Sequence, residues 1–464
     1  MREARILVPV VGGCALAAVA GAGIVLWGQA INYGVSWVLA LGVIVAGLLP
    51  LLREWRQGTF DLFNLKNAFL AYYVMQFGVW GLWILMTGDT KFLGRLDRWR
   101  EPLEWALLYA LLGVLVFHLG YGCRLGERLA AHLPHFPAAW VRIRVWLLAL
   151  VLLPVGLWSF HAILLGAGSL ADFVAELTAN RVHGIREKGY YLLFAWFGPT
   201  IVMLATYATW VETRAKKYAV LFGILLLLVL GIGVSLGYRA FVIFPLLQLL
   251  CLHHYLRARV RLRPRYLGAG LVVAVLLNIY SFYREVPLER LQAREVVAHL
   301  QQAEFWRESS VLFLRRFSGI ESLALIVERT ESHAYGVPAA LTLLTFPIPR
   351  AVWAEKITPI GVLYARLYLY DVANPEGASP TLLGELYWNF HVAGILAGMF
   401  LVGLFCRTAY SYRQLRPDKS ALLLYAVALT YAIWMIDAPT THTAGFISMT
   451  VLVVLALAGL TLFA

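Results

Sequence analysis

Long apolar stretches separated by short polar connections run along almost the whole chain. Each stretch is about 20 residues long, the length that an α-helix needs to cross a hydrocarbon layer roughly 30 Å thick. The pattern predicts twelve membrane-spanning helices. Their expected bounds are residues 5–27, 34–52, 67–86, 104–121, 143–165, 191–211, 218–236, 240–256, 266–283, 382–405, 421–437 and 443–463.

The composition supports the same fold class. Hydrophobic residues make up 61% of the 464 residues and charged residues only 14%. A soluble domain of this size does not need so much apolar surface, so we expect an all-α polytopic membrane protein. The first apolar stretch is longer than that of a cleavable signal and is interpreted as a retained span.

Lys and Arg residues orient the spans, because cytoplasmic connections of membrane proteins carry an excess of them. With residue 1 inside, 21 Lys and Arg lie on the inner side and eight lie in the short outer connections. Both ends of the chain are therefore expected in the cytoplasm. The basic run 257–265 is interpreted as a cytoplasmic loop facing anionic lipid, not as a nucleic-acid site.

Several kinds of site have no sequence pattern here. The sequence has no Asp-x-Asp, His-Glu-x-x-His or glycine-rich phosphate motif, so we predict no metal and no cofactor. Acidic residues in mid-span, expected of an ion-coupled transporter, are nearly missing. No disulfide is expected, because all four cysteines lie in spans or at their inner ends: Cys14, Cys123, Cys251 and Cys406.

One segment breaks the rhythm of span and turn. Residues 284–381 form a large outer loop between spans one to nine (1–283) and spans ten to twelve (382–464). Loops of this length are usually functional. Residues 288–306 and 309–331 have helical apolar spacing and are interpreted as amphipathic helices on the outer membrane surface.

Arginines at the outer membrane boundary are candidate ligands for an anion. Arg239 lies in a tight turn between two spans, where its guanidinium suits bidentate binding of phosphate; snorkelling to the headgroups is the alternative. The same two interpretations hold for Arg284 and for the adjacent pair Arg315 and Arg316. Neighbours on a helix point about 100° apart, so at most one of that pair faces a given site. A second outer loop, 167–191, adds Arg181 and Arg186.

A proline-rich stretch, "FPIPRAVWAEK" (346–356), carries two further cations. Its two prolines restrict φ and stiffen the approach to Arg350. Trp353 and Lys356 follow at three and six residues. The stretch is interpreted as a preorganised ridge with an aromatic platform for a sugar, although Trp353 also suits an interfacial anchor.

The span that begins near residue 382 has an unusual start. "SPTLLGELYWNFHVAG" (379–394) places Glu385, Asn389 and His391 where lipid begins. On a helix, Glu385 and Asn389 share one face, and Tyr387 and His391 share another. Glu385 either caps its helix or pairs with an arginine, or it serves with His391 as a reactive group.

Two polar residues end the last hairpin on the same outer side. Asp437 and His442 are plausible neighbours of such a site, but the sequence favours simple turn residues.

The run from Thr381 to Gly394 resembles the segment that follows the large periplasmic loop in O-antigen polymerases of the Wzy type. "IPRAVWAEK" (348–356), the Gly237–Arg239 turn, the second outer loop and the twelve-span plan are also similar. The resemblance covers about residues 165–405. Position 391 is His where the family leads us to expect Gly, so either the local backbone or the site is expected to differ.

The resemblance implies a GT-C-type glycosyltransferase of the bacterial inner membrane with a periplasmic active site. Such an enzyme moves a growing glycan from undecaprenyl pyrophosphate to the non-reducing end of an incoming lipid-linked repeat unit, in lipopolysaccharide biosynthesis. It needs no metal. Its partners are the two lipid-linked substrates, membrane lipid and a protein that regulates chain length.

The resemblance also implies roles for the residues above. Glu385 or His391 takes a proton from the attacking sugar hydroxyl. The cations bind donor pyrophosphate and stabilise its developing charge; they are Arg239, Arg284, Arg315 and Arg350, with Lys356 in support and Arg181, Arg186 and Arg316 as further candidates. Tyr387, Asn389 and Trp353 bind sugar.

Two other functions stay open. An O-antigen ligase uses the same donor with lipid A core as acceptor, and it is expected to place a prominent histidine in its large loop, for which His333 qualifies. A flippase for lipid-linked oligosaccharides needs a cationic cavity in the membrane and has little need for a large outer loop.

Overall fold

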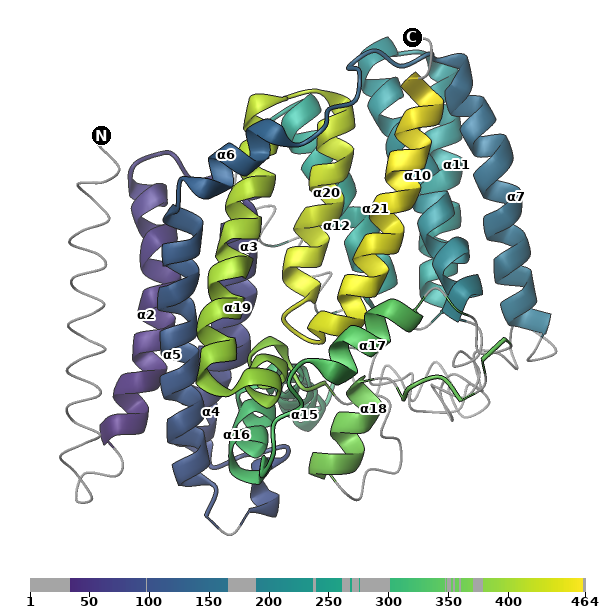
Figure 1. Cartoon of the computed structure of the whole chain (residues 1–464). Coiled ribbons are helices and arrows are strands. Elements are labelled where there is room, and N and C mark those ends of the chain that lie inside the picture. Colours follow the sequence, from purple (N-terminus) through teal and green to yellow (C-terminus); the bar gives the residue numbers. More distant parts are fainter. Residues whose placement is uncertain are drawn as a thin grey trace.

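The computed structural model describes residues 34–165 except Asp97, 189–236, 239–260, 268, 275, 301–346, 348, 352–353, 355–358, 360–369 and 379–461. These residues form helices, with no β-strand among them. Figure 1 shows the long helices side by side, with the short helices α15 to α18 gathered at one end. That end is called the outer end here, and the opposite end, which holds most of the basic connections, is the inner end.

Among the described residues, nine helical segments are long and apolar enough to cross a membrane, which confirms a helical multi-pass membrane protein. They are α2 (Gly34–Arg56), α3 to α4 (Leu65–Thr87), α5 (Arg100–Gly122), α7 (Ile143–Leu165), α10 (Gly189–Thr213), α11 (Lys216–Ser235), α12 (Arg239–Leu256), α19 (Leu382–Leu415) and α21 (Pro439–Thr461).

The predicted spans agree with these helices in place and order. The eleventh, α20 (Lys419–Trp434), is shorter than expected and ends three residues before Asp437, which therefore lies in the turn before α21. The expected span 5–27 lies outside the described residues, and so does almost all of 266–283. A short inner helix, α6 (Leu125–His132), follows α5.

The helical segment from residue 65 to 87 changes its hydrogen-bond pattern half-way along. Between α3 (Leu65–Tyr73) and α4 (Trp80–Thr87) runs one π-helical stretch, η1 (Val74–Val79). Such an insertion turns side chains away from the positions that a regular helix gives them, and it frequently occurs at functional sites. Here it brings the Gln76 amide into the polar contacts of the outer end.

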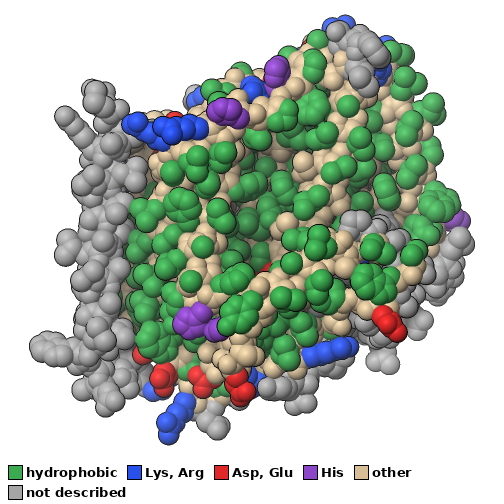
Figure 2. Space-filling view, in the orientation of Figure 1, with side chains coloured by type: hydrophobic (Ala, Val, Ile, Leu, Met, Phe, Trp, Pro, Cys, Tyr) green, Lys and Arg blue, Asp and Glu red, His purple; other side chains and the backbone are tan. Residues whose placement is uncertain are grey.

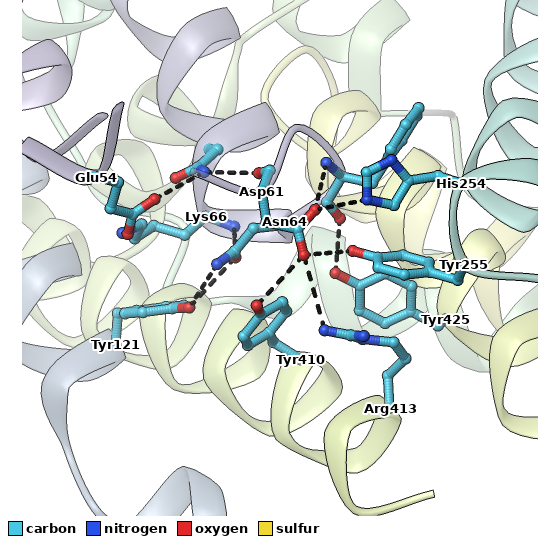
Figure 3. Close-up of polar contacts among 12 residues, drawn as sticks. Glu54, Asp61, Asn64, Lys66, Tyr121, His254, Tyr255, Tyr410, Arg413 and Tyr425 are labelled. Atoms are coloured by element: carbon cyan, nitrogen blue, oxygen red, sulfur yellow. Dashed lines mark hydrogen bonds and ion pairs between the residues drawn. The ribbon is translucent and has the colours of Figure 1, made fainter. Parts of the chain in front are cut away.

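A polar cluster joins the inner ends of two helices, α12 and α19, to the connection between α2 and α3 (Figure 3). Asp61 accepts hydrogen bonds from Tyr255 (2.7 Å) and Tyr410 (3.3 Å). Its carboxylate also lies 3.7 Å from the Arg413 guanidinium and 3.5 Å from His254 Nε2. The guanidinium stacks 4.2 Å from the centre of the Tyr255 ring. The cluster fixes the inner ends of α12 and α19 against one loop.

The large outer loop is folded against the spans. Its described helices are α15 (Ala303–Leu314), η4 (Arg315–Phe317), α16 (Gly319–Arg329), α17 (Val337–Thr345), α18 (Ile360–Tyr364) and η5 (Ala365–Leu369). Residues 319–326 of α16 are all buried, and α16 packs on α5 and α19. The expectation that 309–331 lies on the membrane surface is therefore wrong for α16, because its apolar stripe is covered by protein. Residues 288–300 lie outside the described residues.

Glu321 of α16 fastens this loop to the connection between α4 and α5. Its side chain is fully buried and accepts hydrogen bonds from the backbone N–H groups of Lys91 (2.8 Å), Phe92 (2.6 Å) and Leu93 (3.0 Å). Trp80 Nε1 donates a fourth at 2.6 Å. The short helix η2 (Leu93–Arg95) begins at this contact. A buried carboxylate is stable only when such donors surround it.

We expect Glu321→Gln to destabilise the outer end. The NH2 group of glutamine would face backbone N–H groups that now donate to a carboxylate oxygen, so these donors would lose their acceptor. Hydrogen bonds to charged groups contribute roughly 1.5–3 kcal/mol each, so the free energy of unfolding should fall by about 3 kcal/mol or more. Denaturant unfolding in detergent measures this loss, and hydrogen exchange should accelerate at residues 91–93. Glu328→Gln, an exposed site on the same helix, is the matched control. Equal exchange in both variants would contradict the assignment.

Candidate active site at the outer end

Three segments that are far apart in the sequence meet at one place, which we call the outer corner; its residues are Tyr72, Gln76, Glu385, Asp437 and Thr440. Tyr72 Oη donates to both carboxylate oxygens of Asp437, at 3.0 and 2.9 Å. Gln76 Nε2 donates to the same carboxylate at 2.8 Å, while its Oε1 accepts from the Gly319 backbone N–H. The side chain of Gln76 thus links α16 to the turn between α20 and α21.

Glu385 lies on the other side of that turn. Its side chain is 4% exposed and accepts a hydrogen bond from the Thr440 hydroxyl. The start of α19 is held to the same turn through its backbone, where Leu382 N–H donates to Ile436 O at 2.8 Å. Thr381, not Glu385, caps the helix. Among the described residues Glu385 therefore neither caps its own helix nor pairs with an arginine.

Asp437 has a larger part in the outer corner than the sequence indicates. Burial raises the pKa of its carboxyl group to about 7, and the hydrogen bond from Tyr72 opposes this rise. The only sequence signal is an acid at the outer end of an apolar hairpin. The same signal describes many ordinary turns, and Asp437 does lie in a turn; the sequence shows neither its burial nor its contacts with Tyr72 and Gln76.

The helix α19 breaks just after its polar start. Phe390 (φ −141°, ψ 23°) and His391 (φ 57°, ψ −151°) leave helical geometry, so the regular spacing from Leu382 ends at Asn389. A Cβ on Gly394 would lie 2.2 Å from Leu386 O, and only glycine allows this close approach. The backbone of His391 has a conformation that favours glycine, and holding it there costs on the order of 1–3 kcal/mol. The position where the resemblance led us to expect glycine is thus a strained histidine.

The face of α19 opposite the outer corner carries rings. The His391 ring lies 4.7 Å from Tyr387 and 5.2 Å from His333, centre to centre, and Tyr109 stacks on Tyr387 at 5.5 Å. His333 Nδ1 lies 3.3 Å from Trp388 O. His391 is exposed, whereas Glu385 is buried. The rings of Tyr387 and His391 are in contact as predicted, but His391 lies beyond the end of the regular helix, so helical spacing is not the cause of this contact.

Asn389 holds the outer segment in place. Its Nδ2 donates to Glu385 O at 2.7 Å and its Oδ1 accepts from Gly336 N–H at 2.9 Å. Both polar ends of its amide are engaged by the protein, and the side chain is 5% exposed. Its predicted role in sugar binding stays a prediction.

The two arginines of η4 lie close to the outer corner. Phe317 packs edge-on against Tyr72 with ring centres 5.9 Å apart, which places Arg315 and Arg316 beside it in the chain. Arg315 pairs with Asp89 at 2.6 Å, and Arg316 is exposed. Burial lowers the pKa of Lys91; Glu321 opposes this shift, and the positive charges of Arg316 and Arg315 add to it. Three cations therefore gather on this side.

The structure describes only some of the other residues that were predicted to bind the substrate. Arg239 is half-buried at the first turn of α12. Trp353 is 43% exposed, and Lys356 Nζ donates to the carbonyls of Phe346 (3.2 Å) and Ile348 (3.1 Å), so this amine caps the end of α17. Four predicted arginines lie outside the described residues: Arg181, Arg186, Arg284 and Arg350. Convergence of the arginines on one anion stays a prediction.

The surface beside the outer corner is hollowed between α19 and the α20–α21 hairpin, and an acidic side chain is visible at the floor (Figure 2). The walls are mostly apolar. Within the described ranges, no group of three or more His, Cys, Asp or Glu side chains is arranged to hold a metal.

Comparison with protein-family models, characterised proteins and solved structures gives no match for this chain. The resemblance given above therefore rests on residues and spacing alone.

We expect Asp437→Asn to flatten the pH dependence of stability. An acid whose pKa rises on folding binds more protons in the native state, so the free energy of unfolding falls as pH rises from about 4 to about 7 and levels off above that. Thermal unfolding in detergent between pH 5 and pH 8 should show the variant gaining on the parent protein as pH rises. Glu331→Gln, an exposed site in the outer loop, is the control. Parallel curves for parent and variant would contradict the assigned shift.

The strain at position 391 predicts an unusual order of stability. Glycine adopts the observed backbone freely, whereas alanine keeps the strain and also loses the ring contacts. His391→Gly should therefore unfold with a free energy about 1–2 kcal/mol higher than His391→Ala. Denaturant titration of the two variants measures the difference directly. An alanine variant as stable as the glycine variant would show that the backbone at this site is relaxed.

Proposed function

We propose that the chain is a metal-independent glycosyltransferase that polymerises lipid-linked oligosaccharide repeat units. It would act at the periplasmic side of a bacterial inner membrane, in lipopolysaccharide biosynthesis, with a GT-C-type fold. Donor and acceptor would both carry undecaprenyl pyrophosphate. The observation that carries the proposal is the concentration of a carboxyl group and an imidazole in one short stretch of α19, residues 385–391, where the helix breaks beside a hollow that opens sideways from the bundle.

The position of these groups suits a substrate with a lipid tail and a sugar head. A spanning helix rarely begins with a buried carboxylate and a strained, exposed imidazole, because each costs free energy in that setting. A lipid-linked sugar would leave its tail among the apolar walls of the hollow. Its pyrophosphate would then lie near the cations of η4, and its sugars would extend along the start of α19 toward His391.

In the proposed reaction, a sugar hydroxyl of the acceptor repeat attacks the anomeric carbon of the donor glycan. The bond from that carbon to pyrophosphate breaks as the new glycosidic bond forms, and undecaprenyl pyrophosphate leaves with the bonding electron pair. His391 is the better of the two predicted bases, because its ring is exposed while Glu385 is occupied by Thr440. Glu385 would then orient the turn that carries Asp437.

The cations would hold the leaving pyrophosphate. Guanidinium groups bind phosphate oxygens bidentately and stabilise charge that develops as the bond breaks. Arg239, Arg315 and Arg316 are the described candidates, and Arg181, Arg186, Arg284 and Arg350, with Lys356, complete the proposed set. Tyr387 and Trp353 would stack on sugar rings. A protein that regulates chain length is a proposed further partner.

One contact favours a ligase as the second candidate. His333 belongs to the large outer loop, and its ring lies 5.2 Å from His391. A ligase would use such a loop histidine against a lipid A core acceptor.

A cell-free assay separates these functions. Purified protein in proteoliposomes is given lipid-linked repeat units, with or without lipid A core. Ladders of glycan on undecaprenyl pyrophosphate support the polymerase, transfer only to lipid A core supports the ligase, and translocation without new bonds supports a flippase.

We expect Arg239→Ala to abolish ladders without lowering the amount of folded protein, because it would remove a ligand of the leaving group. Arg128→Ala, an exposed site on the inner helix α6, is the matched control and should keep parental activity. Gel analysis of radiolabelled product gives the readout. Ladders retained at more than a tenth of the parental level would remove Arg239 from the mechanism.

A further inference from the structure

The helix α17 has its apolar and polar sides reversed relative to a helix in water. Val337, Leu341 and Leu344 are 56%, 41% and 74% exposed. Their spacing of four and three residues places them on one face. Thr345 is only 7% exposed. The helix therefore turns leucine and valine outward and a hydroxyl inward.

The polar groups of α17 are satisfied within the helix. The hydroxyl of Thr342 donates to Pro338 O at 2.7 Å, and that of Thr345 donates to Leu341 O at 2.7 Å. No charged residue occurs between residues 337 and 345. Hydroxyls bonded to their own helix are typical of helices in lipid, where water does not serve as a partner.

The start of α17 lies at the depth where the hydrocarbon layer ends. Gly336 N–H donates to Asn389 Oδ1 at 2.9 Å, and Tyr335 N–H donates to Asn389 O at 3.0 Å. At 1.5 Å per residue, α19 rises roughly 24 Å from its break at His391 to Arg407 near the inner end. Because the hydrocarbon layer is roughly 30 Å thick, a layer with its inner boundary at Arg407 has its outer boundary slightly beyond His391, near Asn389.

The exposed face of α17 continues the lipid-facing side of the bundle. α17 packs on α21, which exposes Ile447 and Val451 (both 50%) and Leu455 (62%). Figure 2 shows apolar side chains running from α21 down across α17. Beyond α17, Val352 is 79% exposed.

The chain returns to water soon after that. Trp353 is followed by Glu355 and Lys356, and a Trp beside a Lys is typical of the membrane interface.

We infer that α17 is embedded in the outer leaflet, with Val337, Leu341 and Leu344 against lipid acyl chains. The partner is lipid and not a second protein, because the face is continuous with the exposed apolar side of α21 at the outer end of that helix. Part of the large outer loop thus belongs to the membrane, next to the hollow. This inference does not depend on the proposed reaction.

The test places an environment-sensitive fluorophore on Leu344→Cys in protein whose own cysteines are replaced. The labelled protein is reconstituted in phosphatidylcholine vesicles. Leu455→Cys on α21 is the lipid reference, and Glu331→Cys, exposed in the outer loop, is the water reference. The emission at position 344 should be shifted to shorter wavelength, as at 455. Doxyl-labelled phosphatidylcholine should quench it, and iodide should not.

Two outcomes overturn the inference. Iodide quenching equal to that at position 331 would place α17 in water. Protection from both quenchers would mean that protein covers this face. Leu341→Cys, on the same face, gives a second measurement if the variant at 344 does not reconstitute.

Discussion

The helix α19 is held by polar contacts at both of its ends. These contacts set the positions of Glu385 and His391. At the outer end, backbone and side-chain hydrogen bonds join Leu382 and Glu385 to the turn between α20 and α21. At the inner end, Arg413 lies among tyrosine rings and beside Asp61. Lipid offers no hydrogen-bond partners, so each of these polar groups has to find one in the protein. A helix held in this way has a fixed rotation and depth.

The break after Asn389 follows from that constraint. The outer part of α19 follows the α20–α21 turn, while the inner part packs along α5. The chain accommodates the difference in two residues, Phe390 and His391, and Gly394 gives the space for Leu386 O to come close. The strained residue is also the exposed imidazole. Buried carboxylates therefore face one side of the break, and histidine and tyrosine rings face the other.

The large outer loop contains three different environments. α16 is part of the protein interior, where Glu321 replaces solvent as the acceptor for three successive backbone N–H groups. η4 carries cations at the protein surface. α17 turns its apolar side chains outward. A loop that folds on the bundle in this way brings polar, charged and apolar surfaces together at the outer end.

Apolar length is a local property, so the sequence by itself determined the spans that the structure describes, their order and the helical start at Leu382. It also anticipated the contact between Tyr387 and His391, although the break at His391 means that the turn of a regular helix is not its cause. Burial and partners depend on distant segments. The sequence alone therefore favours a turn residue at Asp437 over a neighbour of the site, predicts a surface helix where α16 is buried, and leaves the role of Glu385 open. Only the tertiary structure brought Tyr72, Gln76 and Thr440 to these carboxylates, since hydrogen bonds between residues more than 50 positions apart leave no periodic signal in a single chain.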